Sequence, residues 1–153
     1  MNIEKFTERS RGFLQAAQTI ATRESHQRLV PEHLLKALLD DPEGLSSNLI
    51  KRSGGSPERV AEAVDLAVGR VPKVTGDAGQ VYMDASLGRV LAEAEKLAQK
   101  AGDSFVPVER LLMALAMVKS KAKDAMETGA VNAQALNSAI NDIRQGRTAD
   151  SAS

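Results

Sequence analysis

Apolar residues recur along the chain at the three- and four-residue spacing that is typical of amphipathic helices. In the first run, Phe13 and Ala17 fall on one side of such a helix, with polar residues between them. This pattern predicts a helix of about four turns, and Thr7 is placed to cap its amino terminus. A second helix is predicted over 32–39, because Pro31 suits a first helical turn.

The helical spacing continues through the rest of the chain. Helices are predicted over 45–52 and from a cap at residue 56 to about residue 69. Later, Asp84 or Ser86 caps another long helix, a helix follows over about 108–118, and two shorter helices come after it. Because no segment competes as a strand, the sequence predicts an all-α fold of about eight helices.

The chain also contains an internal repeat. The heptapeptide EHLLKAL at 32–38 returns as ERLLMAL at 109–115, which is an offset of 77 residues. The same offset pairs Leu14 with Leu91 without a gap. A self-similar period indicates a duplicated structural unit. We therefore expect two four-helix repeats whose halves superimpose by a near-twofold rotation.

The repeat predicts the domain organisation. Repeat 1 covers about 6–69, an extended bridge containing proline and glycine covers 70–83, and repeat 2 covers about 84–145. Together they form one domain over 1–147. Residues 148–153 are small and polar, which is typical of the start of a linker, so we expect this end to lead into something longer.

Composition narrows the class of protein. Twenty Lys and Arg balance twenty Asp and Glu, and few aromatic residues are present, so the chain lacks the usual features of a nucleic-acid binder. There is no cysteine and no signal peptide, which favours the cytoplasm. The apolar runs are far shorter than the ~20 residues that cross a bilayer. We expect neither nucleic acid nor membrane as a partner.

Motifs for catalysis are scarce. His26 and His33 lack the surrounding ligands of a metal site, and packing or capping is the favoured role of His33. Phosphate-binding and nucleophile-elbow motifs are missing, so the segment itself is not expected to be an enzyme or to hold a cofactor. The residues Met113, Met117 and Met126 are interpreted as core filler rather than as adaptable contacts.

Several motifs resemble the amino-terminal double-repeat (Clp R) domain of ClpB-type AAA+ disaggregases. The resemblance rests on Phe6-Thr7, on PEHLLKALL at 31–39 and on KLAQKAGDSFV at 96–106. The bridge RVPKVTG at 70–76 is similar to the R-[LV]-P-x-V-x-G bridge of that family and unlike the corresponding stretches of ClpA and ClpC. The resemblance covers nearly the entire chain.

This resemblance implies a function in protein disaggregation during stress. The parent protein would be a homohexamer with ATP and Mg²⁺ in two ATPase modules and a coiled coil, working with the DnaK chaperone system. Its partners would be unfolded or aggregated proteins, which the amino-terminal domain helps to engage. The isolated domain would be monomeric and free of cofactor. The alternative is an adaptor-docking domain of a ClpA/ClpC-type protease unfoldase.

The resemblance also implies a substrate-binding site in the seam between the repeats. Its polar members are Thr7, Asp103 and Glu109, and its apolar lining is Leu91 and Val90. Asp103 and Glu109 are expected to be exposed acids that contribute little to stability. The residues alone are equally well explained by structural roles: Thr7 as a helix cap, Asp103 as a turn residue and Glu109 as an acid in the first turn of a helix.

Two further residues bear on this site. Arg110 stands where members of the family can carry a leucine that adds to the apolar lining, so the groove is expected to be less apolar or shifted. Glu32 corresponds to Glu109 in the first repeat and serves as its internal control.

A helix-turn-helix regulator is a rival from another class, but zero net charge and the lack of a recognition helix argue against it.

Overall fold

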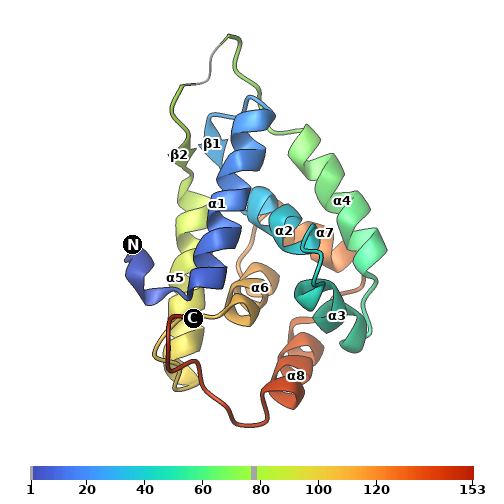
Figure 1. Cartoon of the computed structure of the whole chain (residues 1–153). Helices are drawn as coiled ribbons and strands as arrows, with labels where there is room; N and C mark the ends of the chain where they lie inside the picture. Colours follow the sequence, from blue (N-terminus) through green and yellow to red (C-terminus); the bar gives the residue numbers. More distant parts are fainter. Residues whose placement is uncertain (1, 77–78) are drawn as a thin grey trace.

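The computed structural model describes residues 2–76 and 79–153, so Met1 and two residues of the predicted bridge, 77 and 78, lie outside the described residues. The described residues form eight α-helices, one 3-10 helix and two very short strands (Figure 1). In chain order the elements are η1 (Ile3–Lys5), α1 (Glu8–Arg23), β1 (Arg28–Leu29), α2 (Pro31–Leu39), α3 (Leu45–Arg52), α4 (Pro57–Gly69), β2 (Tyr82–Met83), α5 (Ala85–Lys100), α6 (Val108–Met117), α7 (Lys121–Thr128) and α8 (Ala133–Arg144). The predicted all-α class is confirmed.

Side-chain caps set the starts of the long helices. The side chains of Thr7, Ser56 and Asn132 each accept a hydrogen bond from the backbone N–H three residues on. Asp84, rather than Ser86, caps α5 by accepting from the N–H of Ser86. Each cap satisfies an N–H that has no partner within the helix, which is why the predicted helix starts are accurate.

The expectation that no strand forms is wrong, and the strands that do form are informative. Leu29 of β1 pairs in parallel with Met83 of β2, and Phe6 makes a parallel bridge with Val106. These two pairs are reciprocal, because Met83 and Val106 follow Phe6 and Leu29 by the repeat offset of 77 residues. A twofold relation between the repeats requires such reciprocal contacts.

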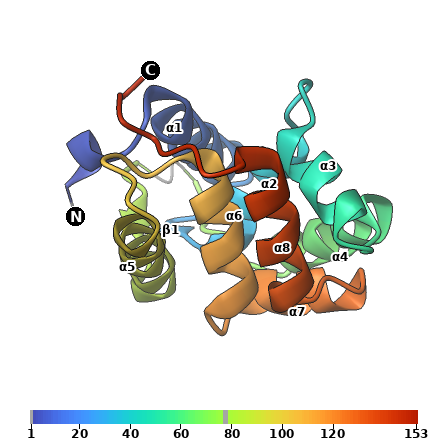
Figure 2. The same cartoon turned by 90° about the horizontal axis from the view of Figure 1, so that it is seen from below.

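The helices pack in the same reciprocal manner. Helix α4 of repeat 1 packs on α7 of repeat 2, while α3 of repeat 1 packs on α8 of repeat 2. Figures 1 and 2 show this interleaving of the two halves around α2 and α6. The largest fully buried side chains come from both repeats: Phe6, Leu34, Leu35, Leu38, Leu49, Ile50, Leu87, Leu91, Leu111, Leu112, Leu115 and Met126. The repeats therefore share one hydrophobic core.

Two of the three methionines discussed above belong to that core. Met113 and Met126 are buried, whereas Met117 at the end of α6 is 40% exposed. Their interpretation as core filler is thus correct for two and wrong for Met117.

Of the helices formed by the described residues, none combines the length and the apolar character needed to span a membrane.

The carboxyl-terminal segment 147–153 lies along the molecule and is held through its backbone. Ser104 and Phe105 both donate their N–H groups to the carbonyl of Ala149, at 2.9 and 3.0 Å. The N–H of Glu8 donates to the carbonyl of Ala152. The segment expected to be a linker therefore passes the turn between α5 and α6 and reaches the start of α1.

Candidate functional site

Thr7 connects the two repeats at the start of α1. Its side chain is buried, accepts from the N–H of Ser10 at 3.1 Å and donates to the Ser10 hydroxyl at 3.0 Å. That hydroxyl and the Thr7 N–H both donate to the carbonyl of Val106, at 2.9 and 3.1 Å. The structure therefore uses Thr7 as a cap and as a tie to the loop before α6.

Asp103 is the centre of a buried polar cluster. Its side chain is 0% exposed and accepts two hydrogen bonds from Arg144, at 2.6 and 2.9 Å. It also accepts from Arg110 Nε at 3.2 Å and from the N–H of Ala149 at 2.8 Å. The expectation that Asp103 is an exposed acid is wrong, because two guanidinium groups and the tail enclose it.

The electrostatics of Asp103 follow from these contacts. Burial alone would raise the pKa of its carboxyl group, because a charged group loses solvation in the interior. The hydrogen bonds from Arg144, Ala149 and Arg110 outweigh burial and hold the pKa of Asp103 below its ordinary value. Asp103 is therefore ionised at neutral pH, and its carboxylate is held by hydrogen bonds from within the protein.

Arg110 and Glu109 lie beside this cluster. Arg110 is buried in its ion pair with Asp103, so it lines no groove in place of a leucine. The Glu109 side chain is 19% exposed, and one of its oxygens lies 3.5 Å from Arg144. The structure thus brings Asp103 and Glu109 together around Arg144, and Glu109 is the acid that solvent can reach.

The apolar residues assigned to the seam are core residues. Leu91 is 1% exposed and Val90 is 0% exposed, both on α5. Neither lines an open groove in this structure, so the expected apolar lining is not formed by these two side chains.

His26 and His33 form a buried pair. His26 Nδ1 and His33 Nε2 are 2.8 Å apart, and His33 Nδ1 accepts from the N–H of Val30 at 3.0 Å. His33 Nε2 must then carry the proton and donate to His26. Burial lowers the pKa of His33 to about 4, with a further contribution from His26. The predicted capping role of His33 is confirmed.

The histidine pair occupies the place of the Asp103–Arg110 pair in the other repeat. Residues 26 and 33 precede 103 and 110 by 77 positions, and each pair ties the turn after a long helix to the start of the next helix. The repeat offset identifies the two pairs as equivalent positions.

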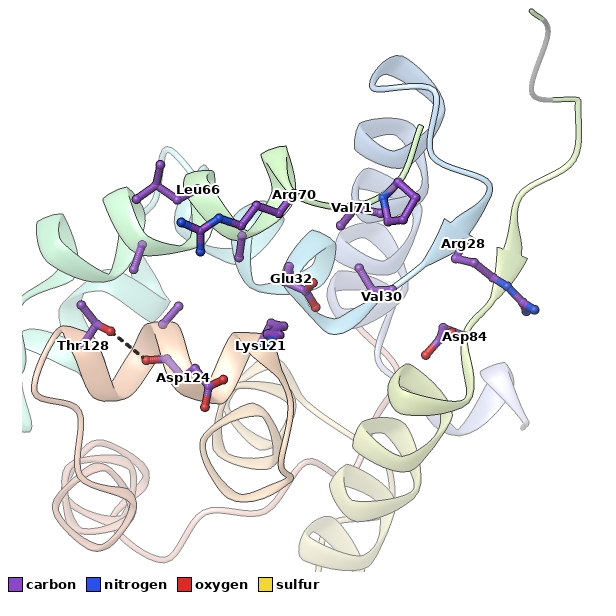
Figure 3. A pocket seen from close by; sticks show the side chains of 14 residues that line it. Arg28, Val30, Glu32, Leu66, Arg70, Val71, Asp84, Lys121, Asp124 and Thr128 are labelled. Atoms are coloured by element: carbon purple, nitrogen blue, oxygen red, sulfur yellow. Dashed lines mark hydrogen bonds between the residues drawn. The ribbon is translucent and has the colours of Figure 1, made fainter. Parts of the chain in front are cut away.

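An open groove lies elsewhere, where α4 and α7 meet the start of α2 (Figure 3). Its volume is about 590 Å³. The lining residues are Arg28, Val30, Glu32, Ala63, Leu66, Ala67, Arg70, Val71, Pro72, Asp84, Lys121, Asp124, Ala125 and Thr128. Leu66 is 62% exposed there, which is unusual for a large apolar side chain. We call this cavity the α4–α7 groove.

Glu32 is the buried polar residue of the α4–α7 groove. It is 6% exposed, and Figure 3 shows its side chain in the middle of the lining residues. Burial raises the pKa of Glu32, and the charge of Asp84 adds to the rise, while a hydrogen bond from its own backbone N–H and the charge of Lys121 oppose it. Among the described residues no cation lies within 4 Å of its carboxylate. Glu32 therefore differs from Glu109 in its surroundings, although the two residues hold equivalent positions in the repeats.

Sequence reasoning missed the α4–α7 groove because its walls come from different repeats. Helix α4 supplies Ala63 and Leu66, while α7 supplies Ala125 and Thr128. Only the apolar Leu66 on the otherwise polar face of α4 could have indicated the groove from the sequence.

Within the described part of the chain, no group of three or more His or acidic residues is arranged to hold a metal ion.

Comparison with known proteins identifies one family. Residues 5–143 match the family model described as the Clp repeat (R) N-terminal domain. The chain is 55% identical over its full length to chaperone protein ClpB of Mesorhizobium japonicum and 36% identical to that of Rickettsia felis. It spans 18% of the length of each of these relatives.

Solved structures share the fold. The N-terminal domain of Hsp104 from Candida albicans superimposes with a TM-score of 0.86 at 22% identity, covering 97% of both chains. The N-domain of ClpV from Vibrio cholerae gives a TM-score of 0.73 at 21% identity, covering 97% of this chain and 90% of that one. At these identities the likeness concerns the fold alone.

Proposed function

Because the chain belongs to the Clp repeat (R) N-terminal domain family, we propose that it is the substrate-engaging domain of a ClpB-type protein disaggregase. The identity of 55% to a ClpB chaperone over the whole chain supports this proposal. The relatives are much longer, so threading by an ATP- and Mg²⁺-dependent homohexamer, and cooperation with the DnaK system in the cytoplasm, would belong to the parent protein.

The observation that carries the proposal is the α4–α7 groove. An exposed leucine over a floor of alanine and valine gives an apolar surface that an unfolded polypeptide can cover. Charged residues around it, such as Arg70 and Asp124, keep that surface hydrated. Weak, broad binding suits a partner that loses conformational entropy on docking, so an affinity nearer micromolar than nanomolar is expected.

The seam residues enter the proposal as a second contact region. Glu109 is the member that solvent reaches, so it would orient polar groups of the substrate. Asp103 already accepts a backbone N–H from Ala149, which is how it would hold an extended polypeptide if the tail moved away. Thr7 would shape the same surface, with Leu91 and Val90 supporting it from the core.

The test is capture of an unfolded model protein, such as fluorescently labelled casein, by the full chain. Leu66→Ser is expected to weaken capture about fivefold, because it removes apolar contact area at an exposed position. Glu109→Gln is expected to weaken it about twofold to threefold. The exposed acid Glu62 on α4 supplies a matched control, and Glu62→Gln should bind like the parent.

Two results would count against the proposal. Failure of the unmodified chain to capture casein up to about 100 µM would contradict direct substrate engagement. Capture only in the presence of a folded adaptor protein would favour the adaptor-docking alternative instead.

A further inference from the structure

The carboxyl-terminal segment 147–153 is the counterpart in repeat 2 of the bridge that follows repeat 1. Val74 and Ala149 are each the fifth residue after the end of the last helix of their repeat, α4 or α8. The N–H of Val74 donates to the carbonyl of Ser25, at 2.9 Å. The N–H of Ala149 likewise donates to the carboxylate of Asp103, at 2.8 Å. Each segment therefore lies along the turn that follows the first long helix of its repeat.

The two segments also lead to equivalent places. The bridge continues into α5, which begins at Ala85. Segment 147–153 runs from α8 past the end of α5 to α1 (Figures 1 and 2), where the carbonyl of Ala152 accepts the N–H of Glu8, the first residue of that helix. Ala85 and Glu8 are separated by the repeat offset of 77 residues. Repeat 1 therefore makes covalently a connection that repeat 2 makes through hydrogen bonds.

Beyond Arg147, the segment is held by its main chain rather than by its side chains. Ala149 and Ala152 provide the main-chain groups that bond to the rest of the molecule, and both residues are half-buried. The hydroxyls of Thr148 and Ser151 are hydrogen-bonded within the segment, and both residues are exposed. The surface beneath the segment therefore accepts an extended chain with small residues at two positions, whatever the sequence between them.

The protein groups that receive this main chain form a small polar surface, which we call the tail slot. They are the N–H groups of Ser104 and Phe105 in the turn before α6, the N–H of Glu8 at the start of α1, and the carboxylate of Asp103. Among the described residues, these three N–H groups have no hydrogen-bond acceptor other than segment 147–153. If the segment left, the tail slot would offer three donors and one acceptor to another main chain.

The strength of this contact suits exchange. A main-chain hydrogen bond that water can reach contributes little net free energy, because water can replace either partner. The segment stays in the tail slot because α8 holds it nearby, which is equivalent to a local concentration on the order of millimolar. A long unfolded polypeptide presents the same main-chain pattern many times along its length, so it can compete with the segment.

We propose that the tail slot binds the extended main chain of an unfolded polypeptide, and that segment 147–153 occupies it as an intramolecular competitor until such a chain displaces the segment. This inference rests on the proposed function and adds a means of regulation to it. A main chain presents N–H and C=O groups in the same order in every sequence, so a slot that contacts only these groups suits substrates without a common motif. Small residues are favoured at the two positions that Ala149 and Ala152 occupy now.

Amide hydrogen exchange, followed by NMR on the full chain, tests whether the segment is docked in solution. The N–H groups of Glu8, Ser104 and Phe105 are expected to be protected in the unmodified chain. Ala149→Pro removes the N–H that bonds Asp103, and it should raise the exchange rates of these three groups about tenfold. Ala149→Ser is the matched control, because it keeps both the N–H and a small side chain, and it should leave the rates unchanged.

Peptide binding tests the competition. The probe is a labelled peptide of the sequence RTADSAS, which is residues 147–153. The Ala149→Pro chain is expected to bind it about tenfold more tightly than the unmodified chain does, because its own segment has left the tail slot. A peptide whose first alanine is N-methylated lacks the N–H that bonds Asp103, and it should bind about fivefold more weakly. Capture of casein should rise about threefold in Ala149→Pro and stay unchanged in Ala149→Ser.

The outcomes distinguish this inference from the proposed function. Rapid exchange of the three N–H groups in the unmodified chain, or casein capture that does not rise when Ala149→Pro releases the segment, would overturn the inference. Should circular dichroism show that Ala149→Pro unfolds, excess RTADSAS peptide decides the matter on the unmodified chain, where it should lower casein capture and where no effect would count against competition. In all these cases substrate engagement stands as long as the unmodified chain captures casein, and loss of that capture would remove both proposals.

Discussion

The Asp103 carboxylate accepts four hydrogen bonds from Arg144, Arg110 and the N–H of Ala149. These donors come from α6, α8 and the tail, so one side chain joins two helices of repeat 2 to the carboxyl-terminal segment. Removing a partner from a buried ion pair leaves uncompensated charge behind. Asp103 therefore makes a large contribution to stability, whatever part it has in binding.

Replacing Asp103 by alanine should accordingly lower the free energy of unfolding by about 3–5 kcal/mol. The physical reason is that two guanidinium groups would stay buried without their acceptor. Urea denaturation measures the change, and Asp124→Ala, at an exposed acid, should change it by less than about 0.5 kcal/mol. A loss below about 1 kcal/mol for Asp103→Ala would mean that water or Glu109 replaces the carboxylate.

The buried histidine pair predicts a pH dependence of stability. The pKa of His33 in the folded state, about 4, lies below the ordinary value of 6.5 that the unfolded chain should show. The unfolded state then binds more protons between pH 6.5 and 4, so stability is complete above pH 6.5 and declines as pH falls through this window. His26, whose pKa is also lowered by burial, acts in the same direction.

The expected slope near pH 5.5 is up to about 1.4 kcal/mol per pH unit for each proton taken up on unfolding. Urea denaturation at a series of pH values between 7 and 4.5 measures it. His33→Gln should flatten the curve by about one proton, because glutamine does not titrate. An unchanged curve for that variant would assign the acid sensitivity to carboxylates instead.

At the scale of elements, the packing of α4 on α7 depends on a glycine. The carbonyl of Gly129, at the end of α7, accepts from the N–H of Ser56 at 2.8 Å. A Cβ on Gly129 would lie 2.9 Å from the Ser56 carbonyl and would collide with Val60. The two helices can approach only because residue 129 lacks a side chain.

Gly129→Ala is therefore expected to destabilise the protein by about 1–3 kcal/mol, as overpacking does. Gly12 on α1 is the matched control, because nothing lies within 4 Å of the corresponding Cβ. Gly12→Ala should stabilise the protein by about 0.5–1 kcal/mol, since alanine is the better helix former. Thermal unfolding of both variants measures the contrast, and equal melting temperatures would contradict it.

The helices themselves could be predicted from the sequence, and their partners could not. Caps such as Thr7 and Ser56 act locally, so the helix starts follow from a few neighbouring residues. The burial of Asp103 depends on Arg144, which lies 41 residues further on, and that contact has no local signal. The α4–α7 groove was missed for the same reason. The involvement of Thr7, Asp103 and Glu109 in substrate binding stays a prediction.

At the scale of the whole molecule, the two repeats share one plan but differ around their equivalent acids. The reciprocal pairs Leu29–Met83 and Phe6–Val106 keep the halves equivalent at the seam. The acids at the starts of α2 and α6 differ in their surroundings, because Glu109 lies beside Arg144 of α8 while the equivalent twelfth residue of α4 is Val68. The site beside Glu109 is nearly filled, whereas Glu32 lies in the open α4–α7 groove.

This asymmetry predicts that a single substitution should restore the missing pair. Val68→Arg places a guanidinium at the position equivalent to Arg144, within reach of Glu32 if the repeats are related by a near-twofold rotation. We expect this variant to stay folded and to fill part of the α4–α7 groove. Urea denaturation measures its stability.

The decisive comparison is a double-mutant cycle with Glu32→Gln. Val68 is buried, so arginine at residue 68 without its acid should destabilise the protein by about 3 kcal/mol or more, whereas with Glu32 present the loss should be at least about 1 kcal/mol smaller. Val68→Met, which adds length without charge, should show no such coupling. If Val68→Arg is equally destabilising with and without Glu32, the acid is not facing the place of the missing arginine, and the equivalence of the two sites fails.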